Sequence, residues 1–273
     1  MIRDITIGQF YPVESKIHEL DARIKIIATF LYIISLFIVN SFIGYGFIIA
    51  ILGITIKVSK VPLKFMLRGI KSIIIIIIFT AFINLFTTKE GTVLIQWGWF
   101  TVTTGGFLLA IKMCMRLALL IIGSSILTLT TTPIQLTDGI EYLLRPFKKI
   151  GVPAHEIAMM MTIALRFIPT LLDETDKIMK AQQARGADFE TGGLIQKAKS
   201  LIPILVPLFI SAFRRADELA MAMEARCYHG DEHRTRMNVM KLETKDYKML
   251  FLLFVYMVFV IGLTILGNYF FII

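Results

Sequence analysis

Charged residues are scarce in this sequence: they make up 18% of its 273 residues, while 56% are hydrophobic and the mean hydropathy is +0.73. A soluble domain contains about 25% charged and about 45–50% apolar residues. The apolar excess is concentrated in runs with almost no charge, such as residues 73–86 and 249–273. Such runs are typical of bilayer spans rather than of a soluble core, so the composition indicates a membrane protein.

Cysteine is also scarce, since only Cys114 and Cys227 occur, and neither their number nor their surroundings imply a disulfide framework. Residues 1–25 contain no apolar run, so we expect no cleavable signal peptide, and the first span would act as the insertion signal. No Gly-x-x-x-x-Gly-Lys-Ser/Thr loop occurs, which argues against ATP hydrolysis by this chain through a P-loop.

The first long uncharged stretch, residues 26–56, holds 31 residues, whereas a span needs about 20. Turn-forming residues, including Asn40 and Gly46, lie in its middle, so two short helices over 26–39 and 43–56 compete with one long helix. Basic residues precede and follow the stretch. Because two spans put both basic groups on one side of the membrane, the positive-inside bias favours two.

Three further spans are expected over residues 72–86, 105–129 and 248–273, which predicts an all-α membrane protein with about five transmembrane helices. Two tryptophans in the loop between the third and fourth spans suit a membrane–water interface. Lys and Arg residues number four before the first span, five between the second and third, and seventeen between the fourth and the last. All of these fall on one inferred side of the membrane, and one falls on the other. This distribution places the N-terminus in the cytoplasm, and it explains the net charge of +9 without nucleic acid.

Residues 1–132 are thus predicted to be a transmembrane region, and residues 133–247 a cytoplasmic coupling region of long amphipathic helices before the final span. The coupling region holds 16 basic and 15 acidic residues. Short apolar stretches within it, 157–172 and 201–213, contain prolines and are expected to lie as bent helices at the membrane face. A model with six or seven spans stays open as an alternative.

Two helices in the coupling region carry a stripe of mostly apolar residues at steps of three or four, as one helix face requires. The first stripe is Ile157, Met161, Ala164, Ile168, Leu171, Thr175, Ile178 and Gln182, and the second is Leu208, Ala212, Ala216, Leu219 and Met223. Charged residues are expected on the opposite faces: Arg166, Asp173, Lys177 and Lys180 on the first helix, and Arg214, Arg215, Asp217 and Glu218 on the second.

Both helices end in Ala-Arg followed by a small residue, as Ala184-Arg185-Gly186 and, 41 residues later, as Ala225-Arg226-Cys227. Ordinary capping explains either end alone about equally well, because a basic residue near a helix C-terminus favours the helix dipole and Gly favours the final turn. The repetition favours two equivalent docking points for two similar partners. Arginine suits that role because its planar fork can hold a carboxylate through two hydrogen bonds.

Four segments carry a resemblance to a known family. They are residues 129–133 (Leu-Thr-Thr-Thr-Pro), 165–169 (Leu-Arg-Phe-Ile-Pro), 183–186 (Gln-Ala-Arg-Gly) and 215–226 (Arg-Ala-Asp-Glu-Leu-Ala-Met-Ala-Met-Glu-Ala-Arg). These segments resemble the transmembrane (T) component of energy-coupling factor transporters, the EcfT/CbiQ family. The resemblance is specific from about residue 128 to 230, whereas the earlier spans match only in number and hydrophobicity.

The resemblance implies a non-catalytic coupling subunit of an ATP-driven importer for vitamins or other micronutrients, in the plasma membrane of a prokaryote. In that family the Ala-Arg-Gly signatures end the coupling helices and sit in grooves of two ATP-binding-cassette ATPase subunits, and a separate membrane (S) subunit binds the substrate. Cys227 departs from the usual glycine. Because a non-Gly residue in the left-handed region costs about 1–2 kcal/mol, this end is expected to turn differently or to continue as helix through Tyr228. A self-contained secondary transporter or channel is the alternative.

Two basic residues, Lys112 and Arg116, lie four apart within the fourth span. A charge at membrane depth costs at least about 2.5 kcal/mol on insertion scales and by default marks function. Lys112 can reach the outer interface by snorkelling. Arg116 lies deeper, and no acidic residue occurs in the five spans, so we expect it to bond backbone carbonyls or polar groups of a partner.

No cofactor or metal is expected, and no catalytic set is complete. His155-Glu156 begins like a zinc-protease helix, but Met159 stands where the second ligand would be. Residues 173–176 (Asp-Glu-Thr-Asp) are interpreted as a solvated helix face with local ion pairs. Residues 229–233, with two histidines and two acids, are interpreted as a solvated loop.

Overall fold

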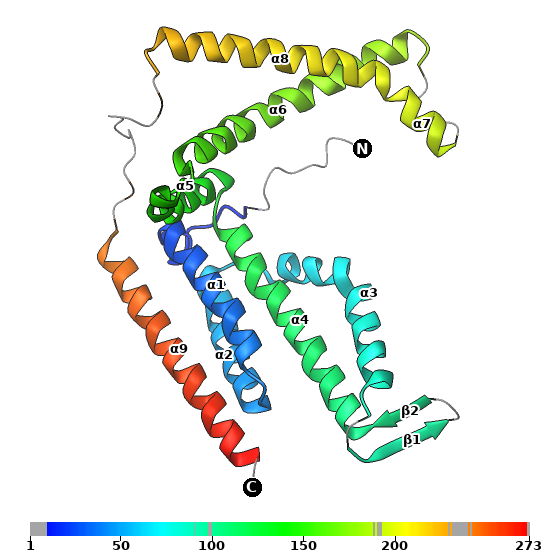
Figure 1. Cartoon of the computed structure of the whole chain (residues 1–273), viewed down its shortest axis with the longest axis vertical. Helices are drawn as coiled ribbons and strands as arrows, with labels where there is room; N and C mark the ends of the chain where they lie inside the picture. The colour runs from blue at the N-terminus through cyan, green and yellow to red at the C-terminus, as the bar shows by residue number, and fades with distance from the viewer. Residues whose placement is uncertain are drawn as a thin grey trace. The chain divides into compact units, whose positions relative to one another are not determined.

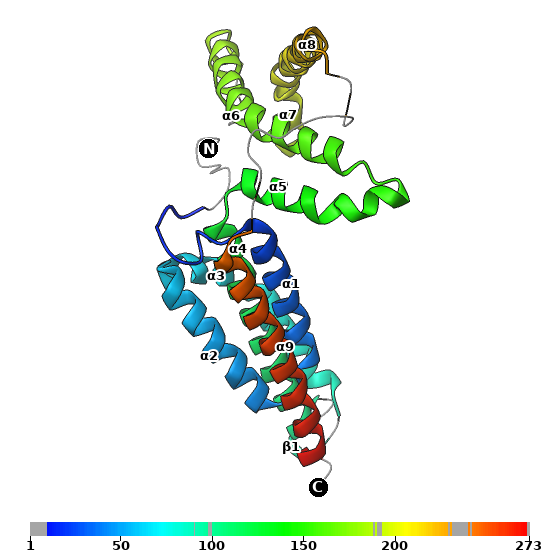
Figure 2. The same cartoon turned by 90° about the vertical axis from the view of Figure 1, so that its left-hand side faces the viewer.

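The computed structural model describes residues 10–89, 91–97, 100–187, 189, 193–228, 230, 240 and 242–271. The chain divides into two compact units: residues 8–139 with 240–273, and residues 1–7 with 140–239. The described elements are almost all α-helices, as Figure 1 and Figure 2 show, which confirms the predicted all-α class.

The larger unit is a bundle of apolar helices, and each helix overlaps one predicted span. These helices are α1 (Ala22–Ile38), α2 (Phe42–Ser59), α3 (Leu63–Thr87), α4 (Thr104–Thr130) and α9 (Thr244–Phe271). Helix α1 packs against α4 and α9, and α2 packs against the same two (Figure 2). The chain leaves helical geometry between α1 and α2, so the prediction of two helices within residues 26–56 is confirmed.

Polar side chains begin three of these helices. The side chains of Asp21, Ser41 and Thr103 accept hydrogen bonds from backbone amides in the first turns of α1, α2 and α4, at 2.9, 3.2 and 3.2 Å. Such caps satisfy amides that have no partner inside the helix. Helix α3 is bent by 58° between Lys71 and Ile73, at the point where its basic first segment gives way to the apolar segment predicted as a span.

The centre of this bundle depends on close approach rather than on the exclusion of water, since lipid is as apolar as the helices. Leu36, Ile48 and Met66 are fully buried, whereas Phe79 and Phe251 on the outer surface are 63% and 70% exposed. Gly123 of α4 also allows close packing. A Cβ there would lie 2.1 Å from the ring of Tyr32 in α1, so only glycine lets these two helices come together.

A two-stranded hairpin lies where a loop with interfacial aromatics was predicted. Strands β1 (Val93–Trp97) and β2 (Phe100–Thr103) pair antiparallel, with Trp97 opposite Phe100 and Val93 opposite Thr103. The β-branched residues of this segment favour a strand. These strands were not predicted, and the interfacial position of the aromatic residues stays a prediction.

A buried lysine joins the segment before α1 to the end of α4. Lys25 is 5% exposed, and its Nζ donates to the carbonyl oxygens of His18 and Thr130, each at 2.9 Å. The backbone amide of Tyr11 donates to the Leu129 carbonyl at 2.9 Å. These bonds satisfy carbonyls in the last turn of α4, where the helix has no amides left to offer.

A second polar cluster joins the starts of α1 and α9. The Asp246 carboxylate accepts from the backbone amides of Asp21 and Glu243, at 3.1 and 2.9 Å. Buried Arg23 donates to the Asp21 carboxylate and to the Met240 carbonyl. Helix α9 is therefore fixed to α1 at one end of the bundle.

By length and composition, four described helices could cross a membrane: α2, α4, residues 244–266 of α9, and α6 (Ala154–Ala184). Helix α3 adds a fifth if its two segments form one span. This set includes α6, which was predicted to be cytoplasmic, and leaves out α1, which has 17 residues. The assignment of α6 to the cytoplasm stays a prediction, supported by the charges in its second half, such as Asp173 and Lys177.

The smaller unit contains the helices of the predicted coupling region. Helix α5 (Pro133–Leu144) leads into it, followed by the 3-10 helix Arg145–Ile150, α6, α7 (Leu194–Ser200) and α8 (Ile202–Ala225). Helix α6 continues through Pro169, and α8 continues through Pro207. Both striped segments are therefore confirmed as helices.

Candidate functional site

The two long helices of the smaller unit, α6 and α8, pack against each other, and Figure 1 shows that they cross. Each helix ends at the alanine of an Ala-Arg sequence, Ala184 in α6 and Ala225 in α8. The two ends lie at opposite ends of the crossed pair (Figure 1). We define the two Ala-Arg turns as residues 184–187 and 225–228.

The first Ala-Arg turn is a complete C-cap. The Gly186 amide donates to the Gln183 carbonyl at 2.9 Å, and the Ala187 amide donates to the Gln182 carbonyl at 3.0 Å. Gly186 lies in the left-handed region, with φ +88°. This pair of bonds with a left-handed residue is a Schellman motif, which ends a helix sharply and satisfies its last carbonyls.

The second Ala-Arg turn has the same geometry despite its cysteine. The Cys227 amide donates to the Glu224 carbonyl at 2.9 Å, the Tyr228 amide donates to the Met223 carbonyl at 3.0 Å, and Cys227 has φ +58°. The expectation that this end turns differently or continues through Tyr228 was therefore wrong. The two hydrogen bonds of the motif offset the cost of a left-handed non-Gly residue.

The arginine of each turn occupies the same backbone position. Arg185 has φ −88° and ψ 6°, and Arg226 has φ −93° and ψ 15°. Both side chains are exposed, and neither forms an ion pair or side-chain hydrogen bond with the part of the chain that the structure describes. Neither guanidinium group, with its five donors, therefore has an acceptor among the described residues.

An ion pair joins the two helices where they pack together. Arg215 Nη2 of α8 lies 2.7 Å from Glu174 Oε2 of α6, and the Ser211 hydroxyl donates to Glu174 Oε1 at 2.5 Å. Two predictions were wrong here. Arg215 was placed on the outer charged face of α8, and Glu174 was assigned to a solvated face with local pairs. The helical period shows which residues share a face but not which partner that face meets.

Arg116, which was predicted to lie within the fourth span, is held by groups of its own chain. Its Nε donates to the Tyr45 hydroxyl at 3.1 Å, and its Nη2 donates to the Val39 carbonyl and Asn40 Oδ1, each at 3.2 Å. The predicted bond to a backbone carbonyl is confirmed. The acceptors lie at the turn between α1 and α2, where helix ends leave carbonyls free.

Lys112, the other base predicted to lie within this span, is one turn earlier in α4. Its Nζ is 5.2 Å from the centre of the Phe42 ring, a cation–π distance, and the Arg116 guanidinium is 5.6 Å from the Phe37 ring. Both cations therefore have partners in this structure. Their geometry points to a structural role at the α1–α2 turn.

Among the described residues, no group of three or more His, Cys, Asp or Glu side chains could hold a metal ion. His155 Nδ1 lies 3.2 Å from Glu141 Oε1, so this nitrogen already has a hydrogen-bond partner. Of the histidine- and acid-containing segment 229–233, only Gly230 falls within the described residues.

Comparison with known proteins gives matches over most of the chain. A family model described as "Cobalt transport protein" (CbiQ) matches residues 13–237. The energy-coupling factor transporter transmembrane protein EcfT of Clostridium kluyveri is 61% identical over 248 residues, which cover 90% of this chain and 92% of the relative. The protein of the same name from Ruminiclostridium cellulolyticum is 57% identical over 261 residues (96% and 97%), and that of Bacillus subtilis is 46% identical over 250 residues (90% and 93%).

Proposed function

The chain belongs to the EcfT/CbiQ family as a transmembrane component of energy-coupling factor transporters, and we propose that it couples two ATPase subunits to a separate substrate-binding membrane subunit. The partner subunits bind and hydrolyse ATP, and this chain is their non-catalytic scaffold in a bacterial plasma membrane. The cargo is a vitamin or another micronutrient, and its selection belongs to the substrate-binding subunit.

The observation that carries the proposal is the matched pair of Ala-Arg turns. Two similar ATPases that each offer the same kind of groove require two docking segments of the same local shape. Arg185 and Arg226 meet this requirement because both follow the last helical residue of a Schellman motif and both are exposed. Each planar guanidinium can hold a carboxylate through two hydrogen bonds, which fixes orientation as well as position.

The helices explain how a movement of the ATPases reaches the membrane. Helices α6 and α8 stay continuous through Pro169 and Pro207, so displacing one end moves the other end too. Helices α6 and α8 are 31 and 24 residues long and are joined by the Glu174–Arg215 ion pair. The concentration of basic residues in the coupling region and at the N-terminus favours a cytoplasmic location for both, where ATP is available.

The test is assembly with the two ATPases after charge reversal at both turns. The variant Arg185→Glu/Arg226→Glu, expressed with the ATPase pair of the same organism, should lose most ATPase co-purification and the transport-linked ATP hydrolysis. A carboxylate in place of each guanidinium repels the acceptor that the arginine would bind. Each single variant should retain one docking point and show an intermediate loss.

The matched control is Lys180→Glu/Arg214→Glu, which reverses two exposed charges on the same helices away from the turns. This control should assemble normally. Normal assembly and ATP hydrolysis of the Arg185→Glu/Arg226→Glu variant would show that the arginines do not dock. Equal losses in both double variants would show that overall charge, rather than the turns, decides assembly.

A further inference from the structure

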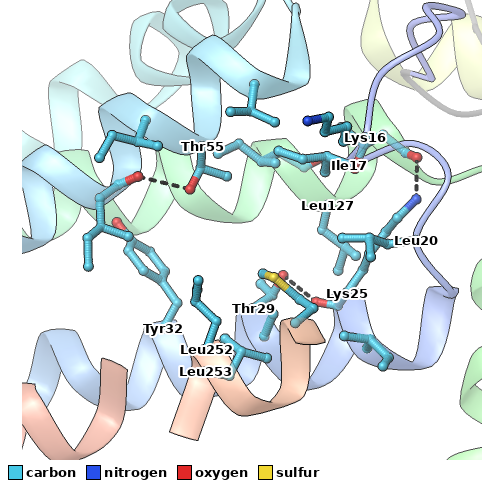
Figure 3. A pocket seen from close by; sticks show the side chains of 18 of the residues that line it. Lys16, Ile17, Leu20, Lys25, Thr29, Tyr32, Thr55, Leu127, Leu252 and Leu253 are labelled. Carbon is cyan, nitrogen blue, oxygen red and sulfur yellow. Dashed lines mark hydrogen bonds between the residues drawn. The ribbon is translucent and has the colours of Figure 1, made fainter. Parts of the chain in front are cut away.

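The larger unit contains a cavity of about 680 Å³ between α1, α2, α4 and α9 (Figure 3). This volume lies within the range of about 300–1,000 Å³ that is usual for small-molecule sites. The lining of the cavity is long and mostly apolar, which suits a narrow, flexible chain.

The walls of the cavity offer almost nothing polar to an occupant. The hydroxyls of Thr29 and Thr55 donate to carbonyls of their own helices, each at 2.9 Å, and the Tyr32 hydroxyl donates to the Leu119 carbonyl at 2.9 Å. Leu127 and Leu253 complete the surface that faces the cavity in Figure 3. Because these polar groups are already paired, the walls suit a hydrocarbon chain.

One end of the cavity is basic. Lys16, Lys25, Lys245 and Lys248 line it together with a single acid, Glu19, and Figure 3 shows Lys16 and Lys25 at the end away from Tyr32. The Lys25 ammonium is bound by two carbonyls, and Lys245 pairs with Glu19 and Glu243 at 3.5 and 3.1 Å.

The other two lysines of this end are available to an occupant. Lys16 and Lys248 are exposed and have no side-chain hydrogen bond or ion pair within the described residues. Their ammonium groups thus lie at the mouth of an apolar cavity and have no anion among the residues that the structure describes. A ligand that satisfies both features carries a negative group on a hydrocarbon chain.

The cavity also reaches the side of the bundle. Ile54 of α2 and Leu252 of α9 line its rim and are 64% and 58% exposed. Exposed apolar residues on membrane helices face acyl chains, so a lipid can enter sideways without crossing water. The basic end lies on the side where the positive-inside bias places the cytoplasm, and the cytoplasmic leaflet carries the anionic lipids.

We propose that this cavity binds an anionic phospholipid of the cytoplasmic leaflet, with an acyl chain between α1, α2, α4 and α9 and its phosphate beside Lys16 and Lys248. The bound lipid fills the gap that these helices leave, and its headgroup joins the segment before α1 to the start of α9. The phospholipid is thereby a structural partner of the bundle, independent of the ATPase contacts.

The experiment is native mass spectrometry of the full chain, delipidated in detergent and then titrated with phosphatidylglycerol, phosphatidylcholine or palmitate. The unaltered chain should retain one phosphatidylglycerol at least fivefold more tightly than phosphatidylcholine. The variant Lys16→Gln/Lys248→Gln should lose this preference, while its unfolding temperature without lipid stays unchanged. The matched control Lys57→Gln/Lys64→Gln removes two exposed lysines of the same unit that do not line the cavity, and it should keep the preference.

A second variant tests the chain-binding part of the cavity. Ala28→Phe places a ring among the lining residues and should reduce binding of phosphatidylglycerol and phosphatidylcholine alike. Equal retention of phosphatidylglycerol and phosphatidylcholine by the unaltered chain would overturn the proposal without any variant. Equal losses of the phosphatidylglycerol preference in the two lysine-pair variants would also overturn it. Palmitate binding as tightly as phosphatidylglycerol would overturn it too, and would identify a free fatty acid as the ligand.

Discussion

Arg215 of α8 donates to Glu174 of α6 at 2.7 Å, and this ion pair joins the two helices that carry the Ala-Arg turns. The carboxylate accepts a second bond from Ser211, so both of its oxygens are used. The two side chains are 36% and 23% exposed, which keeps water near the pair but does not separate it. The contact sets where one helix crosses the other.

Glu174→Ala should loosen this crossing. The change removes two hydrogen bonds to a charged group. At a partly exposed site we expect this to lower the free energy of unfolding by about 1–2 kcal/mol. We expect the unfolding temperature in detergent to fall by about 2–4 °C per kcal/mol, and amide exchange in α8 to become faster. Asp173→Ala, at the exposed neighbouring position, should change neither quantity. Unaltered exchange in α8 after Glu174→Ala would show that the pair does not hold the helices together.

Cys227→Gly should stabilise the second Ala-Arg turn. Cysteine at φ +58° costs about 1–2 kcal/mol, whereas glycine adopts this region freely. Glycine has greater conformational freedom in the unfolded chain, which lowers this gain by about 0.4–1 kcal/mol, so a net gain of about 0–1.6 kcal/mol is expected. Thermal unfolding measures the gain, and Gly186→Ala should produce the opposite shift at the first turn. A loss of stability in Cys227→Gly would mean that the cysteine side chain contributes more than its backbone costs.

Arg116→Lys should destabilise the turn between α1 and α2. Lysine keeps the charge but cannot reproduce the fork that reaches Tyr45, Val39 and Asn40 together. A loss of about 2 kcal/mol follows from the value of hydrogen bonds to charged groups. The reverse exchange, Lys112→Arg, keeps a cation over Phe42 and should be nearly neutral. Thermal unfolding in detergent compares the two variants, and equal shifts would contradict the role of the fork.

Stability should fall as the pH drops below about 6.5, because of His18. Burial lowers the pKa of His18 and the Lys25 ammonium lowers it further, although the bond to the Tyr11 carbonyl raises it in part. The unfolded chain therefore binds a proton first, near pH 6.5. The full contribution of the neutral ring is present above that pH and is lost as the pH falls toward the lower pKa of the folded state.

Unfolding temperatures between pH 7.5 and 5.5 measure this dependence. His18→Gln keeps a donor and an acceptor for the Tyr11 carbonyl and the Ser15 hydroxyl but does not titrate, so the fall should become smaller. The control is His155→Gln, which alters a histidine of the other unit. An identical pH dependence in the unaltered chain and in His18→Gln would exclude this residue as the cause.

The helices were predictable because their signals are local and physical. A run such as residues 26–56 without charge must form helices in a bilayer, and the bases at its ends indicated two of them. The striped segments of α6 and α8 and their Ala-Arg ends were visible for the same reason. The backbone of Cys227 was not, because a side-chain preference predicted a different turn while the helix end imposed the motif.

Contacts between residues far apart in the chain could not be predicted from the sequence. Nothing in the period of α8 distinguishes Arg215 from Arg214 or Asp217, and only the packed helices show which of them meets Glu174. The same holds for Lys25, whose two carbonyl partners come from residues 18 and 130. The hairpin of β1 and β2 was missed because its aromatic residues support two explanations, an interface and a strand.

The Glu174–Arg215 pair occupies the same position on both helices relative to the arginine at each helix end. Glu174 lies eleven residues before Arg185, and Arg215 lies eleven residues before Arg226. At a rise of 1.5 Å per residue, each arm from the pair to its arginine is about 16 Å long. The ion pair therefore joins the two helices at points equally far from their arginines, so the two Ala-Arg turns match in their distance to this contact as well as in their local geometry.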